Sequence, residues 1–221
     1  MLSQTEDRAL MGPDQAAAGA LSTLKRFAGV RRQTEQCDLC SAELLPGHQH
    51  LLDRHTRQIA CACDACSILF CDQQGGKYLR VPREVRQLND FAFSELQWEQ
   101  MMLPINLAFF LRDADGRMIA MYPSPAGAIE SLIDLSRWED QIAGHPRLTT
   151  MQREVEALIV NRVGLEPVYF IAPIDECYRL AGVIRTQWRG LSGGTDVWTA
   201  ITDFFQDLKR KAGVSAEVSH A

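Results

Sequence analysis

Apolar positions in the second half of the chain recur in patterns typical of both strands and helices. Two apolar segments, 105–111 and 118–123, flank the dipeptide Asp115-Gly116, which favours a tight turn, so they predict a β-hairpin. The continuous apolar run at 167–174 predicts a buried strand. Mixed strand and helix patterns of this kind predict an α+β fold, in which a β-hairpin or antiparallel sheet packs against about four to five helices.

Amphipathic segments with helix start signals predict the helices of this domain. The segments, each given with its start signal, are 126–133 (Ser124-Pro125), 137–144 (Ser136 with Glu139), 153–163 (Thr149 with Gln152), 176–188 (Asp175) and 192–213. Serine, threonine and aspartate cap the first free N–H groups of a helix, and proline is tolerated in its first turn. The last helix is expected to end at Gly213, after a basic turn that suits its dipole.

The remaining pattern divides the chain into further parts. We expect an N-terminal tail with an amphipathic helix (1–34), a cysteine-rich metal-binding module (35–87), the α+β domain (88–213) and a disordered tail (214–221). Within the module, residues 50–63 predict two short strands around a polar turn, which would bring two groups of cysteines together. Residues 72–82, which contain a Gly-Gly pair, predict a loop.

Six of the seven cysteines lie in the module, and two pairs have the spacing of metal-binding knuckles. These pairs are Cys37-x-x-Cys40 and Cys63-x-x-Cys66. Two facing knuckles place four thiolates around one ion, as in structural zinc ribbons and rubredoxin-like iron sites. The sequence therefore predicts a small zinc-ribbon or rubredoxin-like module with a Zn ion bound by these four cysteines, and Fe as the alternative metal.

The other three cysteines receive different interpretations. Cys61 and Cys63 are two residues apart, so on a strand they share a face, and Cys61 is the alternate ligand. Cys71 is expected to fill a small apolar site, and Cys177 lies on the core face of a predicted helix. An iron–sulfur cluster is a further alternative, although the spacing matches no standard ferredoxin pattern.

Histidines near the first knuckle suggest another class of protein, a zinc-stapled HNH-like nuclease. His48, His50 and His55 lie between the two cysteine pairs, but no catalytic residue follows the second pair. We expect these histidines to be solvated in a turn. A zinc-finger nucleic-acid-binding protein or nuclease therefore remains an alternative hypothesis.

The composition agrees with a water-soluble globular protein and limits the partners. The chain is 46% hydrophobic and 23% charged, with a formal net charge of -5. The first 87 residues carry eleven basic and ten acidic side chains, whereas the rest carries twelve and eighteen. Nucleic-acid readers usually show a basic patch, so this balance argues against a nucleic-acid partner.

Membrane and secretion signals are not expected. The longest apolar run, 101–111, contains a proline and is about half a membrane span. The N-terminus has no basic segment followed by an apolar one. Seven cysteines, an odd number, with metal-like spacing suit a reducing compartment, so a cytoplasmic location is expected.

Several longer motifs of the chain form a distinctive set: "CDLCSAELLPGHQHLLD", "ACACDACSILF", "GGKYLRVP", "MYPSPAGAIESL" and "PIDECYRLAGVIRTQWRGLSGG". Together they resemble an uncharacterised bacterial family whose genes tend to lie in nickel–iron hydrogenase gene clusters. The resemblance spans roughly residues 35 to 208. It implies that Cys37, Cys40, Cys61, Cys63 and Cys66 are the family's cysteine set, without Cys71.

This resemblance and the cysteine pattern give one leading hypothesis and two others. The leading one is a non-catalytic accessory protein that assists assembly or maturation of a nickel–iron hydrogenase by binding a subunit or precursor. The second is a rubredoxin-like electron-transfer protein with iron in the four-cysteine site. The third is the zinc-dependent nucleic-acid binder or nuclease described above.

Overall fold

The larger part of the molecule is built on one antiparallel sheet. The computed structural model describes residues 35–71, 76–131, 144–190 and 193–218. Six strands lie in the order β4-β9-β8-β5-β6-β7, and all neighbours are antiparallel. Their bounds are Arg86–Gln87 (β4), Leu107–Arg112 (β5), Met118–Ser124 (β6), Gly127–Glu130 (β7), Glu156–Asn161 (β8) and Val168–Pro173 (β9).

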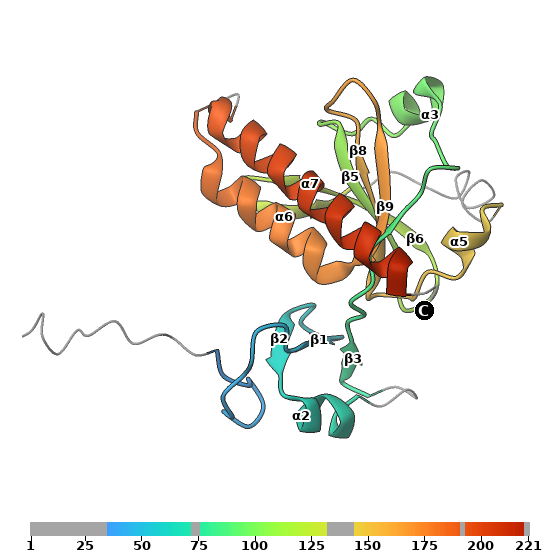
Figure 1. Ribbon diagram of the computed structural model, residues 1–221. Coiled ribbons are helices and arrows are strands. Elements are labelled where there is room, and N and C mark those ends of the chain that lie inside the picture. The colour runs from blue at the N-terminus through green and yellow to red at the C-terminus, as the bar shows by residue number, and fades with distance from the viewer. Residues whose placement is uncertain (1–34, 72–75, 132–143, 191–192, 219–221) are drawn as a thin grey trace, which may run out of the picture.

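Both faces of this sheet are covered. Helices α6 (Ile174–Gln187) and α7 (Gly194–Val218) lie side by side across one face (Figure 1). The short helices α3 (Glu95–Gln100) and α5 (Pro146–Thr149) contribute to the core of the other face. Side chains therefore alternate between two cores, with Phe109 on the α6–α7 side.

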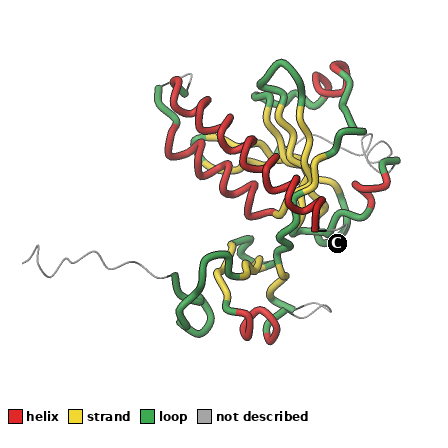
Figure 2. Tube along the Cα trace, in the orientation of Figure 1, coloured by secondary structure: helices red, strands yellow, loops and turns green. Residues whose placement is uncertain are grey.

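A smaller cysteine-rich module precedes this domain. It contains a three-stranded sheet in the order β2-β1-β3 and one short helix, α2 (Figure 2). The bounds are Gln49–Asp53 (β1), Ile59–Ala62 (β2), Asp64–Leu69 (α2) and Tyr78–Arg80 (β3). Asp53 shapes the β1–β2 turn, because its carboxylate accepts the backbone N–H groups of His55 and Thr56 at 2.9 and 3.1 Å.

Strand β1 belongs to the cores of both parts. Leu51 packs into a small core with Cys37 and Cys66, whereas the adjacent Leu52 packs into the α6–α7 core of the domain. Consecutive strand residues point to opposite faces, so one strand serves both cores. Val81, the residue directly after β3, is also buried in the domain core, so it provides a second link between the module and the domain.

Polar contacts close the junction between module and domain. Glu154 is buried, and the Arg54 guanidinium donates hydrogen bonds to its carboxylate at 3.0–3.1 Å. The Arg57 guanidinium lies 3.7 Å from the same carboxylate. Tyr178 of α6 donates to the Arg57 backbone carbonyl at 3.1 Å. A buried carboxylate is stable only with such partners, so these contacts fix the module against the domain.

The structure confirms the α+β class and several predicted elements. The hairpin is β5–β6, with Gly116 at φ +88° in its turn, and the buried strand is β9. The two short strands predicted in residues 50–63 are β1 and β2, which pair antiparallel. None of the described helices combines the length and apolar character that a bilayer crossing requires.

The segment predicted as a helix at 126–133 begins instead with strand β7. The Ser124 hydroxyl donates to the Gly127 carbonyl at 2.9 Å and accepts the Ala126 N–H at 3.1 Å. With Gly127 at φ +115°, this two-residue turn returns the chain alongside β6. Ser124 therefore stabilises a hairpin turn and does not cap a helix.

The segment predicted as a helix at 153–163 contains strand β8. Thr149 ends the short helix α5 and does not begin a longer one. Strand β8 lies inside the sheet with both faces buried, so its apolar residues are continuous and lack the alternation of an exposed strand. The acidic Glu154 and Glu156 of this segment are buried in ion pairs with arginines.

Three smaller expectations also need correction. The predicted loop at 72–82 contains β3, which pairs with β1. Asp175 lies in the first turn of α6 and does not occupy the N-cap, which is Pro173. Helix α7 continues past Gly213 to Val218, into the predicted disordered tail 214–221. A glycine inside an exposed helix costs only about 1 kcal/mol, so the helix need not end there.

Two predicted helices cannot be compared with the structure. The N-terminal helix within 1–34 lies outside the described residues. So does nearly all of the helix predicted at 137–144, together with Ser136 and Glu139 of its capping box.

We expect Leu52→Ala to destabilise the whole chain by about 2–5 kcal/mol, because it opens a cavity in the domain core where the module docks. The matched control is Leu45→Ala in the same module, since Leu45 is 80% exposed and its truncation should change stability little. Urea unfolding followed by tryptophan fluorescence measures both. Equal stability of the two variants would contradict the shared-core assignment of β1.

Candidate metal centre

The four cysteines of the predicted knuckles lie together in space. The Sγ atoms of Cys37, Cys40, Cys63 and Cys66 all lie within 4.8 Å of one another, and the Cys40 and Cys63 sulfurs are 3.7 Å apart. A tetrahedral zinc site with Zn–S distances of about 2.3 Å has sulfur–sulfur edges of about 3.8 Å. The spacing of this group therefore fits one tetrahedrally bound ion.

The first knuckle is a tight turn. The Ser41 N–H donates to the Cys37 carbonyl at 2.8 Å, and the Cys37 N–H donates to the Ala42 carbonyl at 2.8 Å. Ser41 has φ +62°, which allows the chain to reverse directly after Cys40. This reversal brings Cys37 and Cys40 close enough to bind the same ion.

The second knuckle begins helix α2. Cys63 is the N-cap residue, and its Sγ accepts the Cys66 N–H at 3.5 Å. The Ser67 N–H donates to the Cys63 carbonyl at 2.9 Å. These two backbone hydrogen bonds at the helix start hold Cys63 in position beside Cys66.

Asp38 holds the two knuckles in register. Its backbone N–H donates to the Cys61 carbonyl at 2.9 Å, and its carboxylate accepts the Cys61 N–H at 2.6 Å. This pair of bonds connects the first knuckle to the end of β2, two residues before Cys63. The polypeptide itself therefore brings the knuckles together.

The surroundings of the sulfurs favour different protonation states. Burial raises the pKa of the Cys37 thiol, but backbone N–H groups, chiefly that of Cys63, outweigh burial and lower it to about 6. Burial and the neighbouring thiols raise the pKa of Cys66 to about 12. Four adjacent thiolates repel one another, and a bound cation removes that repulsion.

Cys61 is not part of the four-sulfur group. It forms a separate group with His48 and His50, in which one potential ligand atom of each residue lies within 4.8 Å of the others. His50 lies opposite Cys61 in the β1–β2 ladder. The expectation of solvated histidines is wrong for His48, whose side chain is 8% exposed.

The sequence contained a signal for this second group. His48 and His50 are two residues apart, and residues i and i+2 share one face where the chain is extended. The prediction of β1 and β2 as paired strands was correct, but it did not fix the register that places Cys61 beside the histidines.

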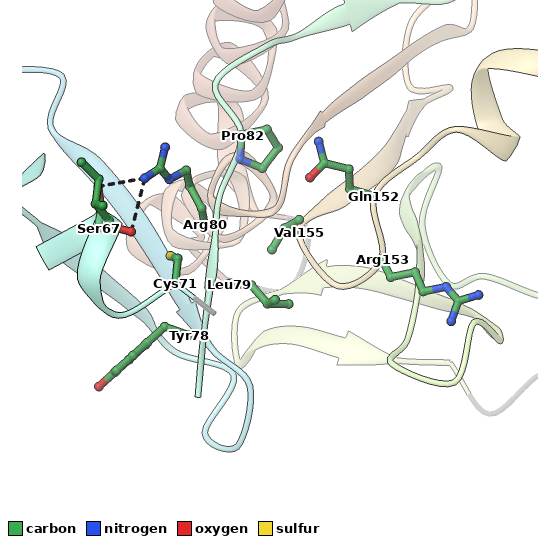
Figure 3. Close-up of a pocket in the computed structure, with 10 residues that line it drawn as sticks. Ser67, Cys71, Tyr78, Leu79, Arg80, Pro82, Gln152, Arg153 and Val155 are labelled. Carbon is green, nitrogen blue, oxygen red and sulfur yellow. Dashed lines mark hydrogen bonds between the residues drawn. The ribbon is translucent and has the colours of Figure 1, made fainter. Parts of the chain in front are cut away.

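The remaining cysteines lie away from both groups. Cys177 is 1% exposed in the domain core, as its helical position predicted. Cys71 lines a cavity of about 710 Å³ where the module meets the domain (Figure 3). On the module side of this cavity Arg80 donates to the Ser67 carbonyl and hydroxyl at 3.3 Å, and Val155 lines it from the domain side.

Comparisons with known proteins match the chain to one family, for which no activity is described. Residues 36–212 match the model of one protein family, described as "Family of unknown function (DUF5947)". No curated protein and no solved structure matches the chain. The matched residues include both knuckles and the whole six-stranded sheet.

We expect Cys37→Ser and Cys66→Ser each to remove about one metal ion per chain and to unfold the module locally, because metal binding supplies much of a small module's folding free energy. Elemental analysis and limited proteolysis measure the two effects. Cys71→Ser and Cys177→Ser are the controls and should keep the full metal content. Loss of one ion in Cys71→Ser would overturn the choice of ligands.

Proposed function

The chain belongs to this family of unknown function, and we propose that it is a non-catalytic metal-binding protein whose four-cysteine centre holds zinc and supports a protein-binding surface. The observation that carries the proposal is the close approach of four thiols from two knuckles. Four protein ligands occupy every coordination position of a tetrahedral ion, and closed sites of this kind are structural. On this proposal the module is zinc-ribbon-like or rubredoxin-like.

Helix α2 supplies the surface that this centre would support. Ile68 and Leu69 end this helix, Phe70 is its C-cap, and the three side chains are 69%, 76% and 48% exposed. Three consecutive large apolar side chains on the surface are typical of a protein-interaction site. Because Cys63 and Cys66 lie at the start of this helix, a bound ion would fix the helix and its apolar residues in place.

The proposed partner is a subunit or precursor of a nickel–iron hydrogenase, and the role is assistance with its assembly or maturation. This choice rests on the resemblance of the cysteine motifs and of "PIDECYRLAGVIRTQWRGLSGG" to a family found in hydrogenase gene clusters. An assembly factor needs a stable surface and no catalytic residues of its own, which agrees with a closed metal centre next to an exposed apolar helix.

Complementation of a gene deletion tests this role. We expect the deletion to lower hydrogenase activity and subunit processing, and the wild-type gene to restore both. A variant with Ile68, Leu69 and Phe70 replaced by serine should keep its zinc and restore neither. The matched control replaces Met102 and Leu165, which are 78% and 105% exposed on the domain, and should complement fully. An unaffected deletion strain would refute the hydrogenase assignment.

A second candidate, electron transfer by iron in the same centre, is favoured by one observation. Cys40 is exposed and Cys63 is partly exposed, so an ion bound there would lie near the surface, where electrons can reach a partner. Protein purified from its native host would then be coloured and contain iron, with an absorption spectrum that bleaches on reduction. Colourless protein containing zinc, with metal exchange during growth controlled, would exclude this candidate.

A further inference from the structure

His48 presents a buried nitrogen without a partner. Its Nδ1 lies 3.2 Å from the Leu45 carbonyl, which can only accept, so Nδ1 carries the proton. A neutral ring then has a lone pair on Nε2, and this atom is buried without a hydrogen-bond partner. A buried polar atom in this state is costly unless something binds it. The ring is therefore oriented as a metal ligand would be.

His50 is oriented in the same way by a carboxylate. Its Nδ1 lies 2.6 Å from Oδ2 of Asp175, and Oδ1 of Asp175 accepts the Glu176 N–H at 2.9 Å. Because Nδ1 bonds to Asp175, the other ring nitrogen of His50, Nε2, is available as a ligand atom. Carboxylate–histidine pairs hold the ring and its tautomer in this manner in many metal sites. The two imidazole rings lie 5.0 Å apart, edge to face.

Cys61 supplies a third ligand of a suitable kind. Its potential ligand atom lies within 4.8 Å of those of both histidines, and the β1–β2 ladder holds it opposite His50. The backbone of Cys61 is fixed on both sides by Asp38. A tetrahedral zinc ion with one sulfur and two nitrogens needs edges of about 3.3–3.6 Å, and the three ligand atoms lie within 4.8 Å of one another.

We propose that His48, His50 and Cys61 form a second metal site, separate from the four-cysteine centre, that binds one divalent transition-metal ion of the Zn²⁺ and Co²⁺ class. Two imidazoles and one thiolate suit such borderline ions better than Ca²⁺ or Mg²⁺. Three protein ligands leave one tetrahedral position open, unlike the closed centre beside it. The proposal is independent of the proposed assembly role.

This second site would also connect the two parts of the molecule. Asp175 belongs to α6 of the domain, whereas the three ligands belong to the module. Metal binding at His50 would strengthen its bond to Asp175, because a metal-bound imidazole is a stronger N–H donor. Occupancy should therefore stabilise the docking of module on domain as well as the module itself.

Metal stoichiometry of the full chain tests the proposal. Chelator-treated protein is titrated with Co²⁺ and then with Zn²⁺, and bound metal is measured by elemental analysis. We expect about two ions per chain for the wild type and about one for His48→Ala/His50→Ala and for Cys61→Ala. The matched controls are His55→Ala and Cys71→Ala, which alter a histidine and a cysteine outside both groups and should keep two ions.

Further measurements keep the test decisive if a variant folds poorly. The second Co²⁺ equivalent of the wild type should add less thiolate-to-metal charge-transfer absorption than the first, because it gains one sulfur ligand instead of four. Asp175→Asn should keep both ions but weaken the second by about 10–100-fold, since Asp175 only orients His50. A wild-type chain that binds one ion, or a double histidine variant that still binds two, would overturn the proposal.

Discussion

Alternation of side chains along β1 connects the module core, the domain core and the histidine group. Leu51 closes the small core behind the four sulfurs, and Leu52 closes the main core beneath α6 and α7. His50 lies in the same strand and reaches Asp175 on α6. Since neighbouring strand residues point to opposite faces, one five-residue strand sets the position of the sulfur centre, the histidine group and the domain.

The two ligand groups differ in what a metal would do there. The four-cysteine group lies inside the module, and its sulfurs come from two turns held together by Asp38. The histidine group lies where the module meets α6, and its geometry depends on a side chain of the domain. An ion in the first would therefore stabilise a local fold, whereas an ion in the second would stabilise an arrangement of two parts.

Short motifs such as the cysteine pairs and the Asp115-Gly116 turn were predicted correctly from the sequence. Features that depend on packing between distant segments were not. The spacing of each knuckle identified its pair of cysteines, and Asp115-Gly116 identified the β5–β6 turn, because both depend on residues a few positions apart in the chain. Strand β8 was mistaken for a helix because burial on both faces removes the alternation that marks a strand. The position of Cys61 beside His48 and His50 was not predicted, because it depends on the register of β1 against β2.

The position of Leu52 has a consequence for how the chain folds during synthesis. Strand β1 and the four knuckle cysteines leave the ribosome before any strand of the large sheet, and domains generally fold from the N-terminus as they emerge. The main core lacks one of its side chains until β1 is in place, since Leu52 belongs to that core. Metal supply at this early stage would then influence the yield of the whole folded protein, including a domain that contains none of the proposed ligands.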